Sequence, residues 1–197
     1  MSGAGPDVLL MAPEGFGGAE LERALGSEPL AELRAALRAA AEAWARTVAP
    51  DAVHHAGGAE PLADTVNRMF GGHHGPLLVA WPLLPRFRRG HAAGALDDLE
   101  AGCDVVLGPV IDGGLYLLGL ARPVPALLSL PEAGWQDPDV MTVGLTAARD
   151  AGIEVGLLRA ERALRSPETS ARRLPICSGP SRAAPAAPSS MAATSGP

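Results

Sequence analysis

Apolar residues along the chain occur either as short continuous runs or as longer stretches with helical spacing. Short runs bounded by glycine, proline or polar residues predict strands, and we expect these at 7–12, 51–56, 77–80, 104–107, 115–121 and 153–158. Recurrence at three- and four-residue intervals predicts helices at 20–25, 28–48, 61–70, 87–101 and 137–151. Helices that alternate with short apolar strands indicate an α/β protein, with a mostly parallel sheet covered on both faces in three α/β/α layers.

Local signals mark where several of these helices begin and end. Gly26 is a plausible break between the first two helices. Asp137 and Pro138 resemble an N-cap and a first turn, and Gly152 a helix stop. Trp44 falls on the apolar stripe of its helix, so we interpret it as a core residue in preference to a ligand platform.

Length and composition predict one folded domain with a tail. A chain of 197 residues, 47% of them apolar, can bury one core. From residue 175 onward the composition changes to proline, alanine, serine and glycine. We therefore expect a domain at 1–174 and a disordered tail at 175–197.

The charge and the cysteine content narrow the functional classes. The formal net charge is -6 and the sequence predicts no concentrated basic face of the kind that phosphate backbones need, which argues against a nucleic-acid partner. The chain has no lysine, which removes Schiff-base chemistry and phosphate-loop lysines. Two cysteines give no disulfide framework, and no apolar run reaches the length of a membrane span. We expect a cytoplasmic protein with no membrane partner, and homo-oligomer formation stays open.

A glycine-rich loop at 13–18 follows the first predicted strand and precedes a helix, the place where α/β sheets bind phosphates. It lacks both the Walker pattern and the dinucleotide fingerprint. Glu14 and Glu20 would repel a phosphate. An ordinary connection is therefore the favoured interpretation.

Histidines form two adjacent pairs, at 54–55 and at 73–74. Neighbouring residues on a strand point to opposite faces, so each pair would offer a metal only one ligand per side. Exposed loop histidines are the better interpretation for the second pair, which sits among glycines.

The most informative stretch is 104–120, which reads as a buried strand, a turn and a second buried strand. Asp112 is followed by Gly113 and Gly114, which permit close approach of the backbone. One interpretation is an acid presented at the ligand-binding edge of a sheet. The other is a simple hairpin turn, and the spacing fits both.

The sequence of 104–120, DVVLGPVIDGGLYLLGL, resembles the motif D-V-V-L-G-P-x-x-D-G-G-Y-Y-L-I-G-L of the rSAM/selenodomain-associated transferases, a group within the GT-A nucleotide-diphospho-sugar transferase superfamily. Leu115 is the chief departure. Segments at 11–13, 21–26, 68–69, 134–140 and 152–155 are similar in order, so the resemblance spans most of 7–174.

The resemblance implies a GT-A-like fold, a nucleotide or nucleotide-sugar ligand and Mg²⁺ or Mn²⁺ as cofactor. It implies that Asp112 is catalytic and a weak metal contact. The substrate-binding positions that it implies are Gly108, Pro109, Gly113, Gly114, Tyr116 and Trp135.

The departures from the family pattern concern charged residues. The first loop resembles K-A-P-x-P-G-x-V-K-T-R-L, but its basic positions here read Met11, Gly18, Ala19 and Glu20. A G-x-D-x-P motif ends the central strand in the family, and Ala80 occupies the position of its metal-binding aspartate. A late D-x-D-T-P-E-D-L motif is reduced at 163–168.

Two functional hypotheses follow from this pattern. The chain is a glycosyl- or nucleotidyltransferase with reduced or lost activity, because removing one preorganised electrostatic partner typically costs roughly 10²- to 10³-fold in rate. The alternative is a catalytically silent binding or scaffold protein that keeps the transferase fold.

Overall fold

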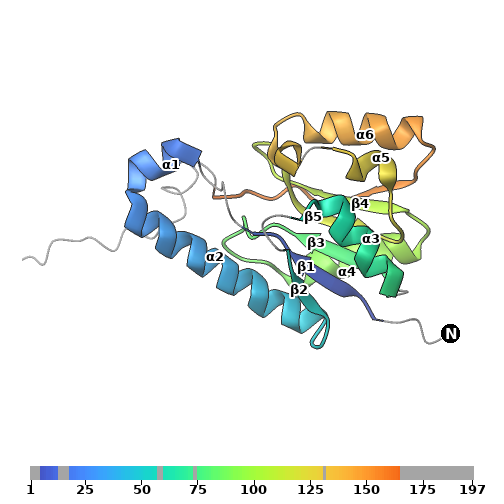
Figure 1. Ribbon diagram of the computed structural model, residues 1–197, viewed down its shortest axis with the longest axis horizontal. Coiled ribbons are helices and arrows are strands. Elements are labelled where there is room, and N and C mark those ends of the chain that lie inside the picture. Colours follow the sequence, from blue (N-terminus) through green and yellow to red (C-terminus); the bar gives the residue numbers. More distant parts are fainter. Residues whose placement is uncertain (1–4, 13–17, 57–59, 73–74, 131, 165–197) are drawn as a thin grey trace, which may run out of the picture.

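A computed structural model of the chain describes residues 5–12, 18–56, 60–72, 75–130 and 132–164 (Figure 1). Its centre is a six-stranded sheet with the order β2-β1-β3-β5-β4-β6. The strands are β1 (Asp7–Leu10), β2 (Val53–His55), β3 (Leu77–Ala80), β4 (Val105–Pro109), β5 (Leu115–Leu120) and β6 (Val155–Leu157).

Five of these strands are parallel to one another. β1 pairs in parallel with β2 and β3, and β4 pairs in parallel with β6. β5 runs antiparallel to its two neighbours, β3 and β4. The predicted three-layer α/β/α fold with a mostly parallel sheet is thus confirmed.

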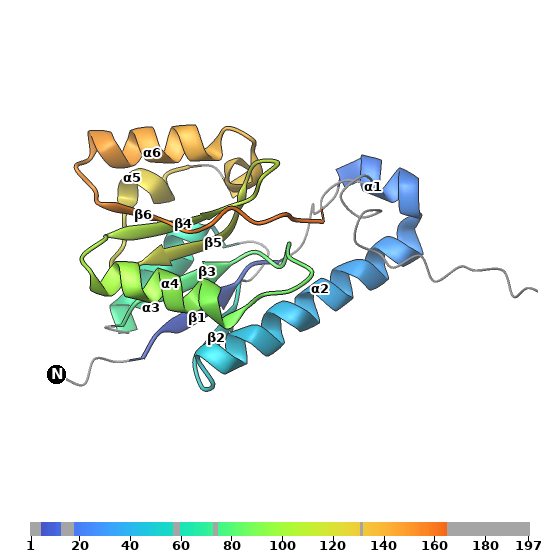
Figure 2. The ribbon, with the colours of Figure 1, turned by 180° about the vertical axis from the view of Figure 1, so that it is seen from behind.

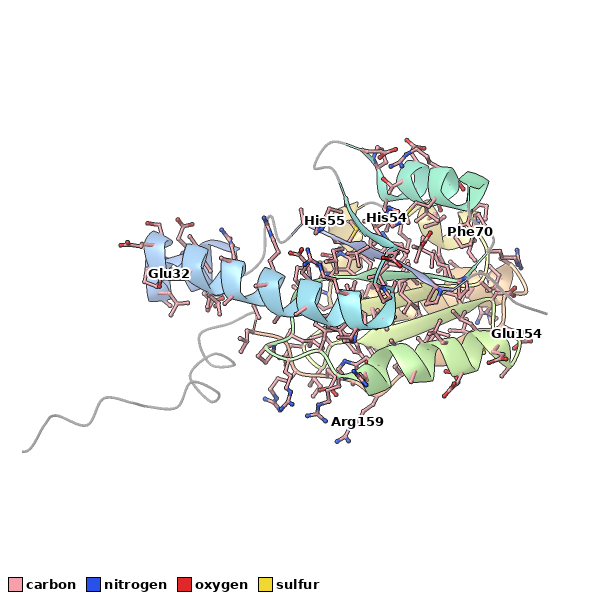
Figure 3. All side chains as sticks on the ribbon, turned by 90° about the horizontal axis from the view of Figure 1, so that it is seen from below. Glu32, His54, His55, Phe70, Glu154 and Arg159 are labelled. Carbon is pink, nitrogen blue, oxygen red and sulfur yellow. The ribbon has the colours of Figure 1, made fainter. Side chains whose placement is uncertain are left out.

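Helices cover both faces of the sheet (Figures 1 and 2). One face carries α2 (Ser27–Val48) and α4 (Arg89–Glu100), which also contact each other. The other carries α3 (Leu62–Gly72), α5 (Pro125–Leu128) and α6 (Val140–Asp150), with a 3₁₀ turn at Glu132–Gln136 before α6. The short α1 (Gly18–Leu25) packs on the part of α2 that extends beyond the sheet, where Glu32 lies (Figure 3).

The core explains why the strand sequences are continuous apolar runs. β1, β3 and β5 lie inside the sheet with helices on both sides, and every residue of all three is buried. β2 is an edge strand and is mostly exposed. In α2 the buried positions recur at helical spacing, and Trp44 is among them, as predicted.

Two of the predicted helix boundaries are confirmed and one is wrong. Gly26 separates α1 from α2 with φ +87°, and Gly152 follows α6 with φ +64°, both in the region that favours glycine. The N-cap predicted at Asp137 is wrong, because α6 begins at Val140 and Asp139 precedes it. The carbonyl of Asp137 instead accepts a hydrogen bond from Gly114 N–H.

One sequence prediction remains untested by this architecture. The division into a domain at 1–174 and a disordered tail at 175–197 stays a prediction, since the tail lies outside the described residues. Among the described residues, no helix combines the length and the apolar character needed to cross a bilayer.

Candidate functional site at the carboxyl edge of the sheet

The carboxyl ends of β1, β2 and β3 meet at one edge of the sheet, where open α/β sheets bind ligands. Backbone pairing continues past the strands: Met11 N–H donates to Ala80 C=O at 2.9 Å, and Ala56 N–H to Leu10 C=O at 2.9 Å. These bonds fix the walls of a pocket of about 180 Å³. Its lining residues come from α2 and from the ends of β1 and β2 and the segments that follow β1, β2 and β3: Leu10, Met11, Ala12, Arg38, Ala41, His55, Ala56 and Pro82.

Arg38 and His55 are the lining side chains that can carry positive charge. Arg38 precedes the buried Ala41 by one helical turn, which places it at the margin of the apolar stripe of α2. A guanidinium there favours an anionic ligand because its planar donors match phosphate oxygens. The sequence analysis did not identify Arg38, although an arginine beside the apolar stripe of a long helix was a usable signal.

The two adjacent histidines of β2 point in different directions. His55 lines the pocket, whereas His54 Nε2 lies 3.7 Å from Asp7 Oδ1, and Figure 3 labels both. This is the split expected for neighbouring residues on a strand.

Asp112 lies in the turn that joins β4 to β5. Val110 C=O accepts a hydrogen bond from Gly113 N–H at 3.0 Å, which closes a four-residue turn with Asp112 at its third position. Gly113 and Gly114 follow with φ +94° and φ +82°. The turn belongs to an antiparallel hairpin, and it lies at the edge where β1 and β3 end. That Asp112 serves a ligand there stays a prediction. The Asp112 side chain is exposed and does not line the Arg38 pocket.

The turn is held from two sides. Gly114 N–H donates to Asp137 C=O at 3.0 Å, and Ile111 N–H to Glu161 C=O at 2.9 Å. A Cβ atom at Gly113 would lie 2.3 Å from Pro138 Cα, so only glycine allows this approach. The position of Asp112 is therefore set by backbone contacts.

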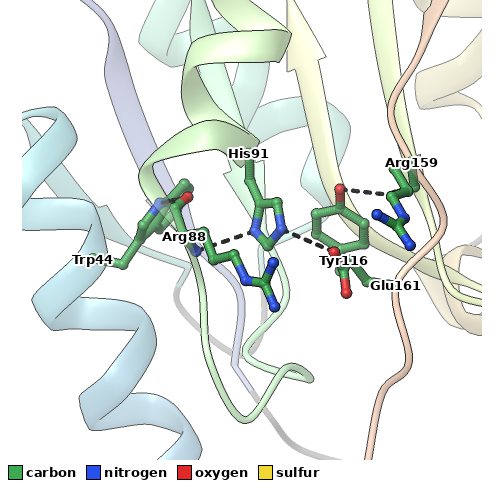
Figure 4. A network of polar contacts seen from close by, with 6 residues as sticks. All are labelled: Trp44, Arg88, His91, Tyr116, Arg159 and Glu161. Atoms are coloured by element: carbon green, nitrogen blue, oxygen red, sulfur yellow. Dashed lines mark hydrogen bonds and ion pairs between the residues drawn. The ribbon is translucent and has the colours of Figure 1, made fainter.

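The other residues implied as substrate-binding are largely buried. Gly108 lies against the ring of Tyr116, where an added Cβ would be 2.8 Å from Tyr116 Cζ. Tyr116 O–H donates to Arg159 C=O at 3.3 Å (Figure 4), and burial raises the pKa of the phenol. Trp135 is 1% exposed, and its ring centroid lies 5.9 Å from that of Trp81. None of these residues, nor Pro109, Gly113 or Gly114, lines the Arg38 pocket, and their substrate roles stay predictions.

The described residues do not fit a dedicated Mg²⁺ or Mn²⁺ site. These ions prefer carboxylate and other oxygen ligands. Ala80 offers only a methyl group, and it is fully buried in β3. Within the described ranges no group of three or more His, Cys, Asp or Glu side chains is placed to hold a metal. Asp112 would have to act alone.

A polar network lies on the α2 and α4 side of the sheet (Figure 4). His91 Nδ1 accepts a hydrogen bond from Arg88 N–H at 3.3 Å, so Nε2 carries the proton and donates to Glu161 Oε1 at 3.3 Å. Trp44 Nε1 donates to Arg88 C=O at 3.0 Å. Burial lowers the pKa of His91, and Glu161 opposes that shift. The network fixes the start of α4 against α2 and against the segment after β6.

Comparison with solved structures places this architecture among known folds. A protein from Desulfovibrio desulfuricans G20, described as a "putative nucleotide-diphospho-sugar transferase", is 18% identical, with 82% of each chain covered and a TM-score of 0.59. Rv0371c from Mycobacterium tuberculosis H37Rv is 14% identical, with 87% of this chain and 98% of that chain covered and a TM-score of 0.47. The first likeness shows a shared, nucleotide-diphospho-sugar transferase-like fold.

The family of the chain follows from its sequence. No curated protein matches the chain. A family model described as "Uncharacterized protein conserved in bacteria (DUF2064)" matches residues 23–133, which is more than half of the chain. The chain therefore belongs to the DUF2064 family.

Proposed function

We propose that the chain binds a nucleotide or a nucleotide-sugar at the carboxyl edge of the sheet, as a GT-A-type transferase whose activity is reduced or lost. The observation that carries this proposal is the pocket of about 180 Å³ with Arg38 and His55 in its lining. It lies where α/β sheets bind ligands, in a fold shared with a nucleotide-diphospho-sugar transferase-like protein. Small-molecule pockets usually measure about 300–1,000 Å³, so this one would hold one part of such a ligand.

The proposed residue roles follow the geometry. Arg38 would contact an anionic group of the ligand, since a charge-assisted hydrogen bond to phosphate is among the stronger polar contacts. Asp112 would act on the sugar or the acceptor from the β4–β5 turn, which Gly113 and Gly114 hold at the same edge. Within the family, we further propose that the chain is a divergent member of the rSAM/selenodomain-associated group.

The proposed loss of activity follows from Ala80. Metal-assisted transfer of a diphosphate-linked group depends on carboxylates that anchor the cation. With a buried methyl group at this position, at least one such anchor is missing. A deficit of roughly 10²- to 10³-fold in rate is the expected scale for one lost electrostatic partner.

A catalytically silent binding or scaffold protein is the second candidate. The buried pair Trp81 and Trp135 favours it, because apolar packing continues from Ala80 to the edge of the sheet. The two candidates share ligand binding in the cleft and differ in turnover.

Calorimetric titration tests the proposal. The full chain is titrated with the common nucleoside diphosphates and their sugar conjugates, with and without Mg²⁺ or Mn²⁺, and hydrolysis of the bound conjugate is measured. We expect saturable binding that Arg38→Ala weakens about tenfold. Arg46→Ala is the matched control, because Arg46 lies on the same helix but pairs with Glu42.

The outcomes separate the two candidates. Metal-dependent micromolar binding and turnover that Asp112→Ala abolishes would refute the silent protein. Saturable binding without turnover in the unmodified chain, left unchanged by Asp112→Ala, would favour it. Absence of heat with every ligand would refute nucleotide binding altogether.

A further inference from the structure

A second concave surface lies along α2, on the flank away from the Arg38 pocket. It is an open groove of about 400 Å³ between α2 and the segment that leads into α4. Residues on a helix advance by about 100° each, so Thr47 in this groove and Arg38 face opposite ways. The residues of this groove, which we call the arginine groove, are Ala40, Ala43, Trp44, Thr47, Arg86, Phe87, Arg88 and Arg89.

The segment that carries the arginines is anchored. Phe87 is 7% exposed, and its ring centroid lies 4.7 Å from that of Trp44. Trp44 Nε1 donates to the carbonyl of Arg88 at 3.0 Å, and the N–H of Arg88 donates to His91 at 3.3 Å (Figure 4). Arg86 and Arg89 are exposed at either end of this anchored pair of residues. The backbone thus holds the three arginine side chains along one wall.

These three arginines gather positive charge at one groove. Within the part of the chain that the structure describes, no ion pair involves the guanidinium groups of Arg86, Arg88 or Arg89. Other arginines of the described part do pair with carboxylates, at positions 46, 68, 122 and 149. Glu161 is the carboxylate of the adjoining network, and it contacts His91. Like charges held close together repel one another, and an external anion relieves that repulsion.

The opposite wall of the groove is small and apolar. Ala40 and Ala43 lie on α2 facing the arginine segment, with Trp44 forming part of the floor. A volume of about 400 Å³ falls within the usual range for a small-molecule site, about 300–1,000 Å³. Guanidinium groups bind phosphate through paired hydrogen bonds, which is a better match than a single ammonium or a neutral donor.

We propose that the arginine groove is a binding site for an organic phosphate, distinct from the nucleotide cleft. The phosphate lies on the guanidinium groups of Arg86 and Arg89, and the body of the molecule covers Ala40 and Ala43. The fixed backbone of the arginine segment and the adjoining surface of Ala40 and Ala43 distinguish this groove from a solvated basic patch.

The test titrates the full chain, by calorimetry at low salt, with ribose 5-phosphate, glucose 6-phosphate and phenyl phosphate. Inorganic phosphate and ribose serve as ligand controls. The test variant is Arg86→Ala/Arg89→Ala, which leaves the helix-capping Arg88 in place. Arg46→Ala controls for net charge on α2, and Arg38→Ala controls for the cleft. Circular dichroism and melting temperature verify that each variant folds.

We expect at least one organic phosphate to bind saturably, more tightly than inorganic phosphate. The double variant weakens this binding about tenfold or more, because each lost charge-assisted hydrogen bond alone is typically worth that factor. Arg46→Ala and Arg38→Ala leave it unchanged.

Several results would overturn the proposal. The proposal is wrong if no organic phosphate binds saturably, or if inorganic phosphate or ribose binds as tightly as the organic phosphates. It is also wrong if the double variant binds them as tightly as the unmodified chain. Loss of binding in Arg38→Ala alone would place the phosphate in the nucleotide cleft and refute a second site. The nucleotide titrations depend on Arg38 and not on the groove, so the two proposals can fail separately.

Discussion

Gly113 offers a direct test of how the turn around Asp112 is built. Replacing it with alanine introduces two independent costs. At φ +94° a side chain is strained by roughly 1–2 kcal/mol. The new Cβ would also lie 2.3 Å from the Cα of Pro138, and such overpacking typically costs about 1–3 kcal/mol. The sum, about 2–5 kcal/mol, is a large share of the usual stability of about 5–15 kcal/mol.

Two other glycines separate strain from clash. Gly102 has φ +112° and Gly152 has φ +64°, values that bracket that of Gly113. A Cβ at either would have no heavy atom within 4 Å beyond the adjacent residues of the chain. Alanine at these positions therefore reports backbone strain alone, and we expect a loss of about 1–2 kcal/mol at each.

Urea denaturation of the three variants measures the difference. Shifts in the unfolding midpoint at constant slope convert to changes in the free energy of unfolding. We expect Gly113→Ala to lose at least about 1 kcal/mol more than either control. A loss equal to that of Gly102→Ala would show that Pro138 moves away freely, and the packing argument for the fixed turn would then be wrong.

Three further predictions concern the α2 and α4 side of the sheet. Trp44→Phe removes the hydrogen bond to the Arg88 carbonyl but keeps an aromatic ring, so the free energy of unfolding should fall by about 0.5–1.5 kcal/mol in denaturation experiments. Gly108→Ala should lose about 1–3 kcal/mol in the same assay, because its Cβ would press on the buried Tyr116 ring. Burial lowers the pKa of His91 in the folded chain, so folding favours the neutral imidazole. The stability that neutral His91 contributes is complete above the unfolded pKa of about 6.5, and it is lost as the pH falls from there through the lower pKa of the folded chain. His91→Asn keeps an acceptor for Arg88 N–H and removes this titration, so unfolding curves from pH 5 to 8 should depend less on pH; an unchanged slope would contradict the assignment.

The elements that sequence reasoning predicts well are those whose local pattern matches their tertiary surroundings. β3 is predicted at its observed bounds, Leu77–Ala80, because a central strand buried on both faces must be apolar throughout. α2 is predicted almost to the residue because 22 residues contain several turns of one apolar stripe. α5 and the 3₁₀ turn before α6 are too short to show a period, and they were not predicted.

The candidate site was less predictable for a physical reason. Its pocket is assembled from β1, α2, β2 and the end of β3, and no local pattern joins Arg38 to His55 or Pro82. The motif around Asp112 is local, so it identifies a strand, a turn and a strand. Whether that turn reaches a ligand depends on contacts distant in sequence, such as the hydrogen bond from Gly114 to Asp137.

Ala80, the position that the family resemblance assigns to a metal-binding aspartate, is a test of the proposed loss of activity. Ala80 is 0% exposed to solvent, and its strand lies between β1 and β5. Trp81, the next residue, is 6% exposed. Ala80→Asp would bury a carboxyl group among apolar side chains, and protein data put the cost of an uncompensated polar group at about 1–3 kcal/mol, with more for a charge. Ala80→Asn is the control of equal size, and the melting temperature of both variants is followed as Mg²⁺ is added. If the site is closed by packing, Mg²⁺ raises neither melting temperature. If Mg²⁺ raises the melting temperature of Ala80→Asp and not that of Ala80→Asn, a metal can bind at this position. Binding of an anionic ligand at this edge would then not depend on the Arg38 side chain alone.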